Sequence, residues 1–382
     1  PSLYNALFRS IEWDNQFIYN TVSKKIDKLD PIDIEYALEF FTDDFEIQCV
    51  RKYAVRCVDN AAKDQEKKKD IFLYLPQIIQ ATKANYTDGL GEILINIALG
   101  DVVFASRLYW LSIIDDDPIV TQMNEKMRTT LDNVRKKEIF KQINLFQDIE
   151  NMLSKVKPNL PKLKKQDDIK ALLNGEFKRL SSFKEPILSP LNPTFEFLGM
   201  DPNDVKVFAS NKSPVALVFN ARDTNDPDKS NITKIKMMFK IGDDIRQDQL
   251  ILQLFGIMDK IFKASDLDLC ITTYNILAIS DKFGCMEFVE NSQAIKDIDD
   301  NIDDEKFASD NLKKMSNLNI ESILSTTTAP VESTNSKILI YLKRDNPSEE
   351  DYRKRIDTYT RSLAGFSVMT FVLIIGDRHD NN

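Results

Sequence analysis

Residues 239–248 read FKIGDDIRQD, and this stretch joins an expected strand to an expected helix. Residues 234–240 alternate, with Ile235, Met237 and Phe239 on one face, which is the spacing of a strand that has one covered face. Gly242 and two aspartates then turn the chain, and residues 245–264 carry apolar side chains at helical spacing. The stretch therefore predicts a strand, a turn and a helix, with Lys240 at the end of the strand.

More short strands are expected on both sides of this stretch. Residues 205–210 and 215–220 flank an Asn-Lys-Ser-Pro turn and read as a hairpin, and residues 274–279 and 285–289 read as a second one. A linker is marked by Pro186, Pro190 and Pro193. Strands, one helix and further strands are the layout of a small kinase-type N-lobe, which we place at residues 186–290.

The chain before this lobe, residues 1–185, is expected to be an all-α, solenoid-like accessory domain. Apolar residues recur at i, i+3, i+4 and i+7 in residues 34–41, and helical spacing continues in 47–58, 71–82 and 90–114. Residues 121–155 read as one long amphipathic helix. The lysine-rich run 155–165 reads as a solvated joint between helices, with a membrane-facing patch as the alternative.

Residues 291–382 are expected to begin a second kinase lobe. Residues 291–347 are rich in Asp, Asn, Ser and Thr and read as a polar insertion, with a short helix near 312–324. Residues 349–375 read as helix. Its uncharged part, 362–376, is expected to be buried, because spanning a bilayer takes roughly 18–20 residues.

The last residues, 376–382, read GDRHDNN and contain His379, the single histidine of the chain. A lone histidine is more often structural than catalytic. The spacing D-R-H-x-x-N nevertheless fits kinase chemistry, because an Asp or His can take a proton from an attacking hydroxyl and an Asn can hold Mg²⁺.

Charge and cysteine usage exclude several function classes. The net charge is −9 and the pI is about 5.0, so no overall basic field indicates nucleic-acid binding. The four cysteines show no CxxC spacing, and only one histidine is available, so a structural zinc site is not expected. Free thiols in a reducing compartment are the simplest interpretation.

The polar residues around the central stretch have both chemical and structural interpretations. Lys240 suits a phosphate-binding lysine, although a strand lysine more commonly faces solvent. Asp243 and Asp244 can simply complement the dipole at a helix start. Asp248 is harder to explain in this way, because it lies further along an otherwise apolar helix.

Two more places carry the same ambiguity. Tyr274 begins an expected strand, where a core or edge tyrosine is common. The turn at Ser210–Ser213 could bind phosphate through its backbone N–H groups, but it contains no glycine.

Two blocks in this order resemble the motifs of the phosphatidylinositol 3-kinase family. Residues 239–248 have the form F-K-x-G-D-D-x-R-Q-D of the family signature, and residues 376–382 resemble its catalytic loop. Residues 208–214 look like its phosphate-binding loop, with Ser213 in place of the usual methionine, and residues 286–289 sit where the adenine-binding hinge sits. The helical blocks at 31–39 and 50–55 resemble its accessory domain.

The resemblance covers most of the chain, apart from 120–185 and 291–347, and it implies a fold. That fold is an all-α, solenoid-like helical domain followed by a bilobal, protein-kinase-like lipid kinase domain that is truncated in the C-lobe. The family pattern continues with a D-F-G motif and an activation loop, which do not occur before Asn382. We therefore expect the 382-residue chain by itself not to phosphorylate lipid.

The resemblance also implies a role for each matched residue. Nucleotide-binding roles fall on Lys240, Asp243, Asp248, Tyr274, Glu287, Val289, Ser210 and Asn211. Lys240 would contact the ATP phosphates, Asp248 and Tyr274 would line the polar pocket behind it, and the backbone at 287 and 289 would take the adenine. Catalytic roles fall on His379, Asp377 and Arg378, with His379 as general base or charge stabiliser toward the inositol hydroxyl. Asn382 would bind Mg²⁺, for which Mn²⁺ could substitute.

Residues 108–110 and 356–362 are more similar to class III of the family than to class I. Class III membership implies transfer of the ATP γ-phosphate to the 3-hydroxyl of phosphatidylinositol, in endosomal and autophagic membrane trafficking. It also implies a cytoplasmic, peripheral membrane protein with a kinase-like regulatory subunit and a coiled-coil autophagy subunit, and no nucleic-acid partner. A class I or class II kinase and a catalytically dead kinase-like scaffold stay open as alternatives. A protein-serine kinase is disfavoured because no G-x-G-x-x-G loop is present.

Overall fold

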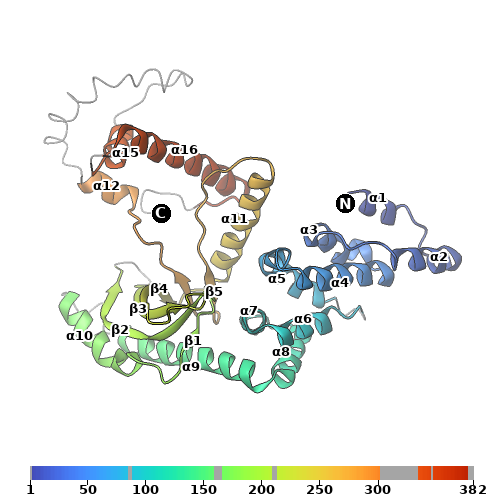
Figure 1. Cartoon of the computed structure of the whole chain (residues 1–382), viewed down its shortest axis with the longest axis horizontal. Helices are drawn as coiled ribbons and strands as arrows, with labels where there is room; N and C mark the ends of the chain where they lie inside the picture. Colours follow the sequence, from blue (N-terminus) through green and yellow to red (C-terminus); the bar gives the residue numbers. More distant parts are fainter. Residues whose placement is uncertain are drawn as a thin grey trace. The chain divides into compact units, whose positions relative to one another are not determined.

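The computed structural model describes residues 2–84, 88–158, 166–208, 213–301, 334–345 and 347–376 (Figure 1). The chain divides into two compact units. The first comprises Pro1–Gln253 with Tyr274–Phe288, and the second comprises Leu254–Thr273 with Val289–Asn382.

The first unit begins with a series of helices, as its apolar spacing predicts. They are α1 (Ser2–Arg9), α2 (Gln16–Ile26), α3 (Ile34–Ala37), α4 (Gln48–Lys63), α5 (Lys68–Thr82), α6 (Leu90–Gly100), α7 (Val102–Ile113), α8 (Pro118–Thr130), α9 (Asn133–Val156) and α10 (Gln166–Phe177). Short 3₁₀ helices lie at Leu38–Phe41, Asp43–Phe45 and Lys178–Leu180. Consecutive helices pack on one another, notably α4 on α5 and α6 on α7, so the expected stacking of helical pairs is confirmed.

Two of the expected helices are each broken in two by an aspartate. The block 90–114 divides into α6 and α7 at Asp101, whose carboxylate accepts the N–H groups of Val103 and Phe104 at 2.7 and 3.1 Å. The single helix expected at 121–155 was wrong, because α8 ends at Thr130 and α9 starts after Asp132, which caps the N–H of Arg135 at 2.9 Å. In a continuous helix these N–H groups would donate to carbonyls of the preceding turn. Here the aspartate carboxylate accepts them, so that a new helix can begin.

The sheet of the first unit has the strand order β1-β2-β3-β4-β6-β5, and all of its pairs are antiparallel. The strands are β1 (Ile187–Leu188), β2 (Phe195–Val207), β3 (Val215–Asp223), β4 (Thr233–Ile241), β5 (Ile276–Ala278) and β6 (Phe283–Glu287). Both expected hairpins are confirmed. The strand β2 begins at Phe195, ahead of the expected start at residue 205, because its pairing with β3 continues through two shifts of register.

An aromatic chain connects the helices to this sheet. Trp110 of α7 packs on Phe146 of α9 with 5.2 Å between ring centroids, and Phe146 packs on Phe239 of β4 at 6.4 Å. In Figure 1 the long helix α9 runs along the sheet, and it contacts both β1 and β4. Phe239 is 1% exposed, so the expected inner face of β4 is confirmed, and the buried ring fixes the strand one residue before Lys240.

The second unit is helical in its described part. The helix α11 (Arg246–Ala264) enters it from the first unit, and α12 (Ile295–Asn301), α15 (Thr334–Leu342) and α16 (Glu349–Val372) follow. Phe255 and Phe366 meet edge to face at 5.6 Å. A Cβ at Gly365 would lie 2.5 Å from Cδ1 of Ile271, so any larger residue there would have to displace this side chain. The short helix expected near 312–324 lies outside the described residues.

The expected burial of residues 362–376 was only half right. Gly365, Met369 and Thr370 are buried in α16, but the exposed apolar side chains include Leu363, Val368, Phe371 and Ile374. An α-helix turns 100° per residue, so the side chains of an uncharged run point in all directions around the helix axis. A single neighbouring surface can bury only the side chains on one side of the helix. Among the described helices, none combines the length and apolar character needed to cross a membrane.

Candidate nucleotide-binding site

Lys240 stands at the end of β4 between two carboxylates. In the register of the sheet it faces Gly284 of β6. Its Nζ lies 3.6 Å from Oδ2 of Asp243 and 3.7 Å from Oδ2 of Asp248, and its side chain is 23% exposed. Both distances exceed those of a charge-assisted hydrogen bond, which are about 2.7–2.9 Å. The ammonium is therefore neutralised in part, yet it stays accessible to a further anion.

The turn after β4 separates the two neighbouring aspartates. Gly242 has φ +72°, a conformation that favours glycine, and its N–H donates to the carbonyl of Lys282 at 2.7 Å. Asp244 turns away from Lys240 and accepts from the backbone N–H and the guanidinium of Arg246. These bonds lower the pKa of Asp244 to about 2. Asp244 thus caps α11, while Asp243 and Asp248 face the lysine.

Tyr274 belongs to the same site. It lies two residues before β5, so the strand that was expected to begin at Tyr274 begins instead at Ile276. Its ring packs on the buried cluster of Ile245, Ile276, Ala278 and Met286. Burial raises the pKa of Tyr274, and the charge of Asp248 raises it further. The phenol is therefore protonated at neutral pH and can act as a hydrogen-bond donor.

The two residues expected to take the adenine lie at the end of β6, because Glu287 is its last residue and Val289 comes two positions later. The N–H of Glu287 already donates to the carbonyl of Asn275 at 3.0 Å, and the Glu287 carboxylate accepts from the N–H and side chain of Asn275. Val289 is 37% exposed, and its carbonyl accepts from Oγ of Ser292 at 2.6 Å. Within the described part of the chain, the N–H of Val289 has no hydrogen-bond acceptor. Of these two residues, only Val289 keeps an N–H group for a ligand.

Several predicted site residues lie outside the described residues. They are Ser210, Asn211, Asp377, Arg378, His379 and Asn382. The structure describes the two ends of the turn that was expected to bind phosphate. The N–H of Phe208 donates to the carbonyl of Pro214 at 3.0 Å, and Ser213 has φ +45°. Among the described residues, no three His, Cys, Asp or Glu side chains are placed to hold a metal ion.

Two polar contacts at this site were not predicted from the sequence. Oε1 of Gln249 on α11 accepts the N–H of Ala278 at 2.7 Å and ties the helix to β5. Lys157, in the basic run expected to be solvated, is half-buried, and its Nζ donates to the carbonyl of Ile241. The expectation of a solvated joint was therefore wrong for Lys157, although it holds for the exposed Lys155. Residues 159–165 of that run are outside the described residues.

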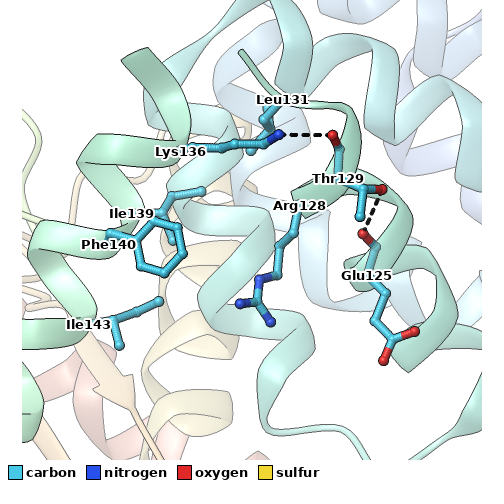
Figure 2. A pocket seen from close by; sticks show the side chains of 8 residues that line it. All are labelled: Glu125, Arg128, Thr129, Leu131, Lys136, Ile139, Phe140 and Ile143. Atoms are coloured by element: carbon cyan, nitrogen blue, oxygen red, sulfur yellow. Dashed lines mark hydrogen bonds between the residues drawn. The ribbon is translucent and has the colours of Figure 1, made fainter. Parts of the chain in front are cut away.

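A separate pocket lies between α8 and α9, remote from Lys240 in sequence (Figure 2). It has a volume of about 520 Å³ and an apolar wall that includes Ile139, Phe140 and Ile143. Lys136 Nζ closes one side by donating to the Thr129 carbonyl at 2.9 Å. Of the predicted site residues that the structure describes, none lines this pocket.

Two family models match the chain. The model described as "Phosphoinositide 3-kinase family, accessory domain (PIK domain)" matches residues 1–145. The model described as "Phosphatidylinositol 3- and 4-kinase" matches residues 234–382 and so includes Lys240, Asp248 and Tyr274. The fold is thus a helical accessory domain followed by a kinase domain, and the chain belongs to the phosphoinositide 3-kinase family.

Several curated proteins that are similar to this chain are named phosphatidylinositol 3-kinases. The nodule isoform of phosphatidylinositol 3-kinase from Glycine max is 29% identical over 98% of this chain and 43% of that protein. Phosphatidylinositol 3-kinase VPS34 from Arabidopsis thaliana is 27% identical over 98% of this chain and 43% of that protein. Phosphatidylinositol 3-kinase pik3 from Schizosaccharomyces pombe is 27% identical over 98% of this chain and 44% of that protein. The chain spans less than half the length of these relatives.

Proposed function

We propose that the complete protein is a lipid kinase that transfers the γ-phosphate of ATP to the 3-hydroxyl of phosphatidylinositol. The observation that carries this proposal is the accessible Lys240, held between two carboxylates inside the region that matches the kinase family. A point charge in this state suits the phosphates of a nucleotide, because binding replaces weak contacts to carboxylates by short bonds to phosphate oxygens.

The other described residues have roles that follow from their contacts. Asp243 and Asp248 keep the ammonium of Lys240 pointed into the site before the nucleotide binds. The protonated Tyr274 supplies a donor beside Asp248, and the N–H of Val289 donates to the adenine. Lys240 then balances the negative charge that the phosphates bring and keeps the transferring group in place.

The chemical step involves residues of the terminal loop. His379 takes the proton of the attacking inositol hydroxyl, with Asp377 and Arg378 in the same loop. General acid–base help of this kind contributes roughly 10²–10⁴-fold in rate. Mg²⁺, or Mn²⁺ in its place, would neutralise phosphate charge when bound, with Asn382 as a ligand.

We place the accessory domain at residues 1–185, the N-lobe at 186–290 and the start of the C-lobe at 291–382, with an insertion at 291–347. The start of β1 at Ile187 supports the first boundary. Among the similar proteins, the name VPS34 of the Arabidopsis thaliana relative supports class III, the vacuolar-sorting type. For a class III enzyme we propose peripheral binding to endosomal and autophagic membranes, together with a kinase-like regulatory subunit and a coiled-coil subunit.

The test is an ATP/Mg²⁺ assay of the complete protein on vesicles that contain phosphatidylinositol or its bisphosphate. We expect phosphatidylinositol 3-phosphate to form from the first vesicles and little product from the second. A preference for the bisphosphate would favour a class I enzyme. A non-catalytic scaffold would be favoured if the complete protein folds, lacks a D-F-G motif and forms no lipid product.

A further inference from the structure

Lys157 directly follows the last residue of α9 and reaches the end of β4. Its backbone N–H donates to the carbonyl of Leu153 at 2.9 Å and closes the helix. Its side-chain Nζ donates to the carbonyl of Ile241. A Cβ on Gly242 would lie 3.5 Å from this Nζ, so the ammonium also lies against the turn that separates Lys240 from Asp243.

The sheet explains why Ile241 needs this contact. The peptide between Ile241 and Gly242 directs its N–H toward Lys282 and β6, so its carbonyl points to the opposite side, toward β3. The ladder between β3 and β4 has already ended there, because its last pair is Val215 with Phe239. Lys157 therefore supplies the donor that a strand partner would otherwise supply.

We propose that Lys157 is a positioning residue for the nucleotide site. Its bond to Ile241 and the bond from Gly242 to Lys282 hold the two sides of one peptide, and they fix the start of the turn. The position of Asp243, and with it the direction of Lys240, depends on that turn. This inference rests on the proposed function, since it assigns Lys157 to the site that binds ATP.

A second lysine of α9 provides a matched control. Lys141 donates to the carbonyl of Pro186, and it pairs with Glu138. It thus makes the same type of bond as Lys157, but from within α9 and at the linker before β1 instead of the turn after β4. Loss of Lys141 should loosen the contact of α9 with the linker and leave the Gly242 turn in place.

The experiment compares the variants Lys157→Met, Lys157→Arg and Lys141→Met in the complete protein. ATP affinity is measured by calorimetry without lipid, and the KM values for ATP and phosphatidylinositol are measured in the lipid assay. Because Lys157→Met removes a hydrogen bond from a charged donor, we expect it to weaken ATP affinity by about 5–20-fold. We expect an unchanged KM for phosphatidylinositol, substantial rescue by Lys157→Arg, and an effect of less than about twofold from Lys141→Met.

Hydrogen exchange of the Gly242 amide separates this inference from the proposed function. We expect faster exchange in Lys157→Met than in Lys141→Met, with or without ATP. Unchanged exchange overturns the positioning role, and so does an equal loss of ATP affinity in both variants. Faster exchange with normal ATP affinity also overturns it, because Lys157 is then only a structural contact. A wild-type protein that binds no ATP contradicts the proposed function first.

Discussion

Two basic side chains of the first unit, Arg51 and Lys240, differ in burial and in how closely acceptor oxygens approach them. Arg51 on α4 is 1% exposed, and its Nε lies 3.0 Å from Oδ2 of Asp88. Its Nη1 and Nη2 donate to the carbonyls of Phe41 and Ala81 at 2.9 and 3.2 Å. Lys240 is 23% exposed, and its nearest carboxylate oxygens lie 3.6 and 3.7 Å away.

The difference teaches how a charge used for folding differs from a charge that is available to a ligand. A buried charge is tolerable only when fixed acceptors surround it, because desolvation costs several kcal/mol. Arg51 meets this condition, because its Nε pairs with Asp88 and its Nη1 and Nη2 donate to backbone carbonyls. Lys240 has only partial compensation from Asp243 and Asp248, as the proposed contact with nucleotide phosphates requires. Removing either residue should damage a different property of the protein.

The largest effect is expected from Lys240→Met in the complete protein. Turnover of phosphatidylinositol should fall by at least about 10²–10³-fold, as it does when a preorganised electrostatic contact to the reacting group is lost. The melting temperature should change little, because the methionine fills the same space at a half-buried position. Unchanged turnover would remove the main support for the nucleotide site.

The reverse pattern is expected from Arg51→Met. This change leaves Asp88 as an uncompensated buried carboxylate, which typically costs about 3–5 kcal/mol. Hydrogen exchange in α4 and protease sensitivity should both increase strongly. The turnover of the remaining folded protein should stay near the wild-type value. If α4 is as protected as before, Arg51 does not have the structural role assigned here.

A neutral buried group should behave like Arg51, with a smaller effect. Oε1 of Gln142 accepts from Oγ of Ser106 and Nε1 of Trp110 at 2.8 and 2.9 Å, and its Nε2 donates to the carbonyl of Leu188 at 3.0 Å. Gln142→Leu should lower stability by about 1–3 kcal/mol, because these partners stay buried without a bond. The exposed Gln147 on the same helix is the control, and Gln147→Leu should leave the melting temperature within about 1 °C.

The smallest effect concerns pH. Burial alone would raise the pKa of Asp101, but hydrogen bonds from Lys68 and from the N–H groups of Phe104 and Val103 outweigh it, and the pKa is lowered from 3.8. The carboxylate then contributes stability that is fully present above pH 3.8 and is lost as the pH falls through the lower folded-state value.

The corresponding test is the melting temperature of the wild type and of Asp101→Asn across this range. Asparagine can still cap α7, so the variant removes mainly the charge. We expect the wild type to be more stable near neutral pH, and the difference to shrink as the pH falls below 3.8. A difference that is constant over the whole pH range would assign the effect to the cap and not to the charge.

The sequence was most informative where the causes are local. Alternation in residues 234–240 and the turn at Gly242 placed Lys240 at a strand end, and helical spacing placed Asp248 on the following helix. The aspartates that break the helices were missed, because apolar spacing continues through Asp101 and Asp132. The bonds by which they cap a new helix leave no trace in periodicity.

Contacts between distant parts of the chain were out of reach of the same reasoning. Lys157 precedes Ile241 by 84 positions, and nothing in its basic surroundings distinguishes it from the exposed Lys155. The exposure of Phe371 could not be predicted either, because an uncharged run says how much apolar surface a helix has, but not which side a neighbour covers.

The most direct test of the central claim is the affinity of the complete protein for ATP, measured by calorimetry on the wild type and on Lys240→Met. We predict that the wild type binds ATP and that the variant binds it at least about tenfold more weakly, which corresponds to about 1.4 kcal/mol, with an unchanged melting temperature. Equal affinity in the two proteins would contradict the claim that Lys240 is held in place for the phosphates of a nucleotide.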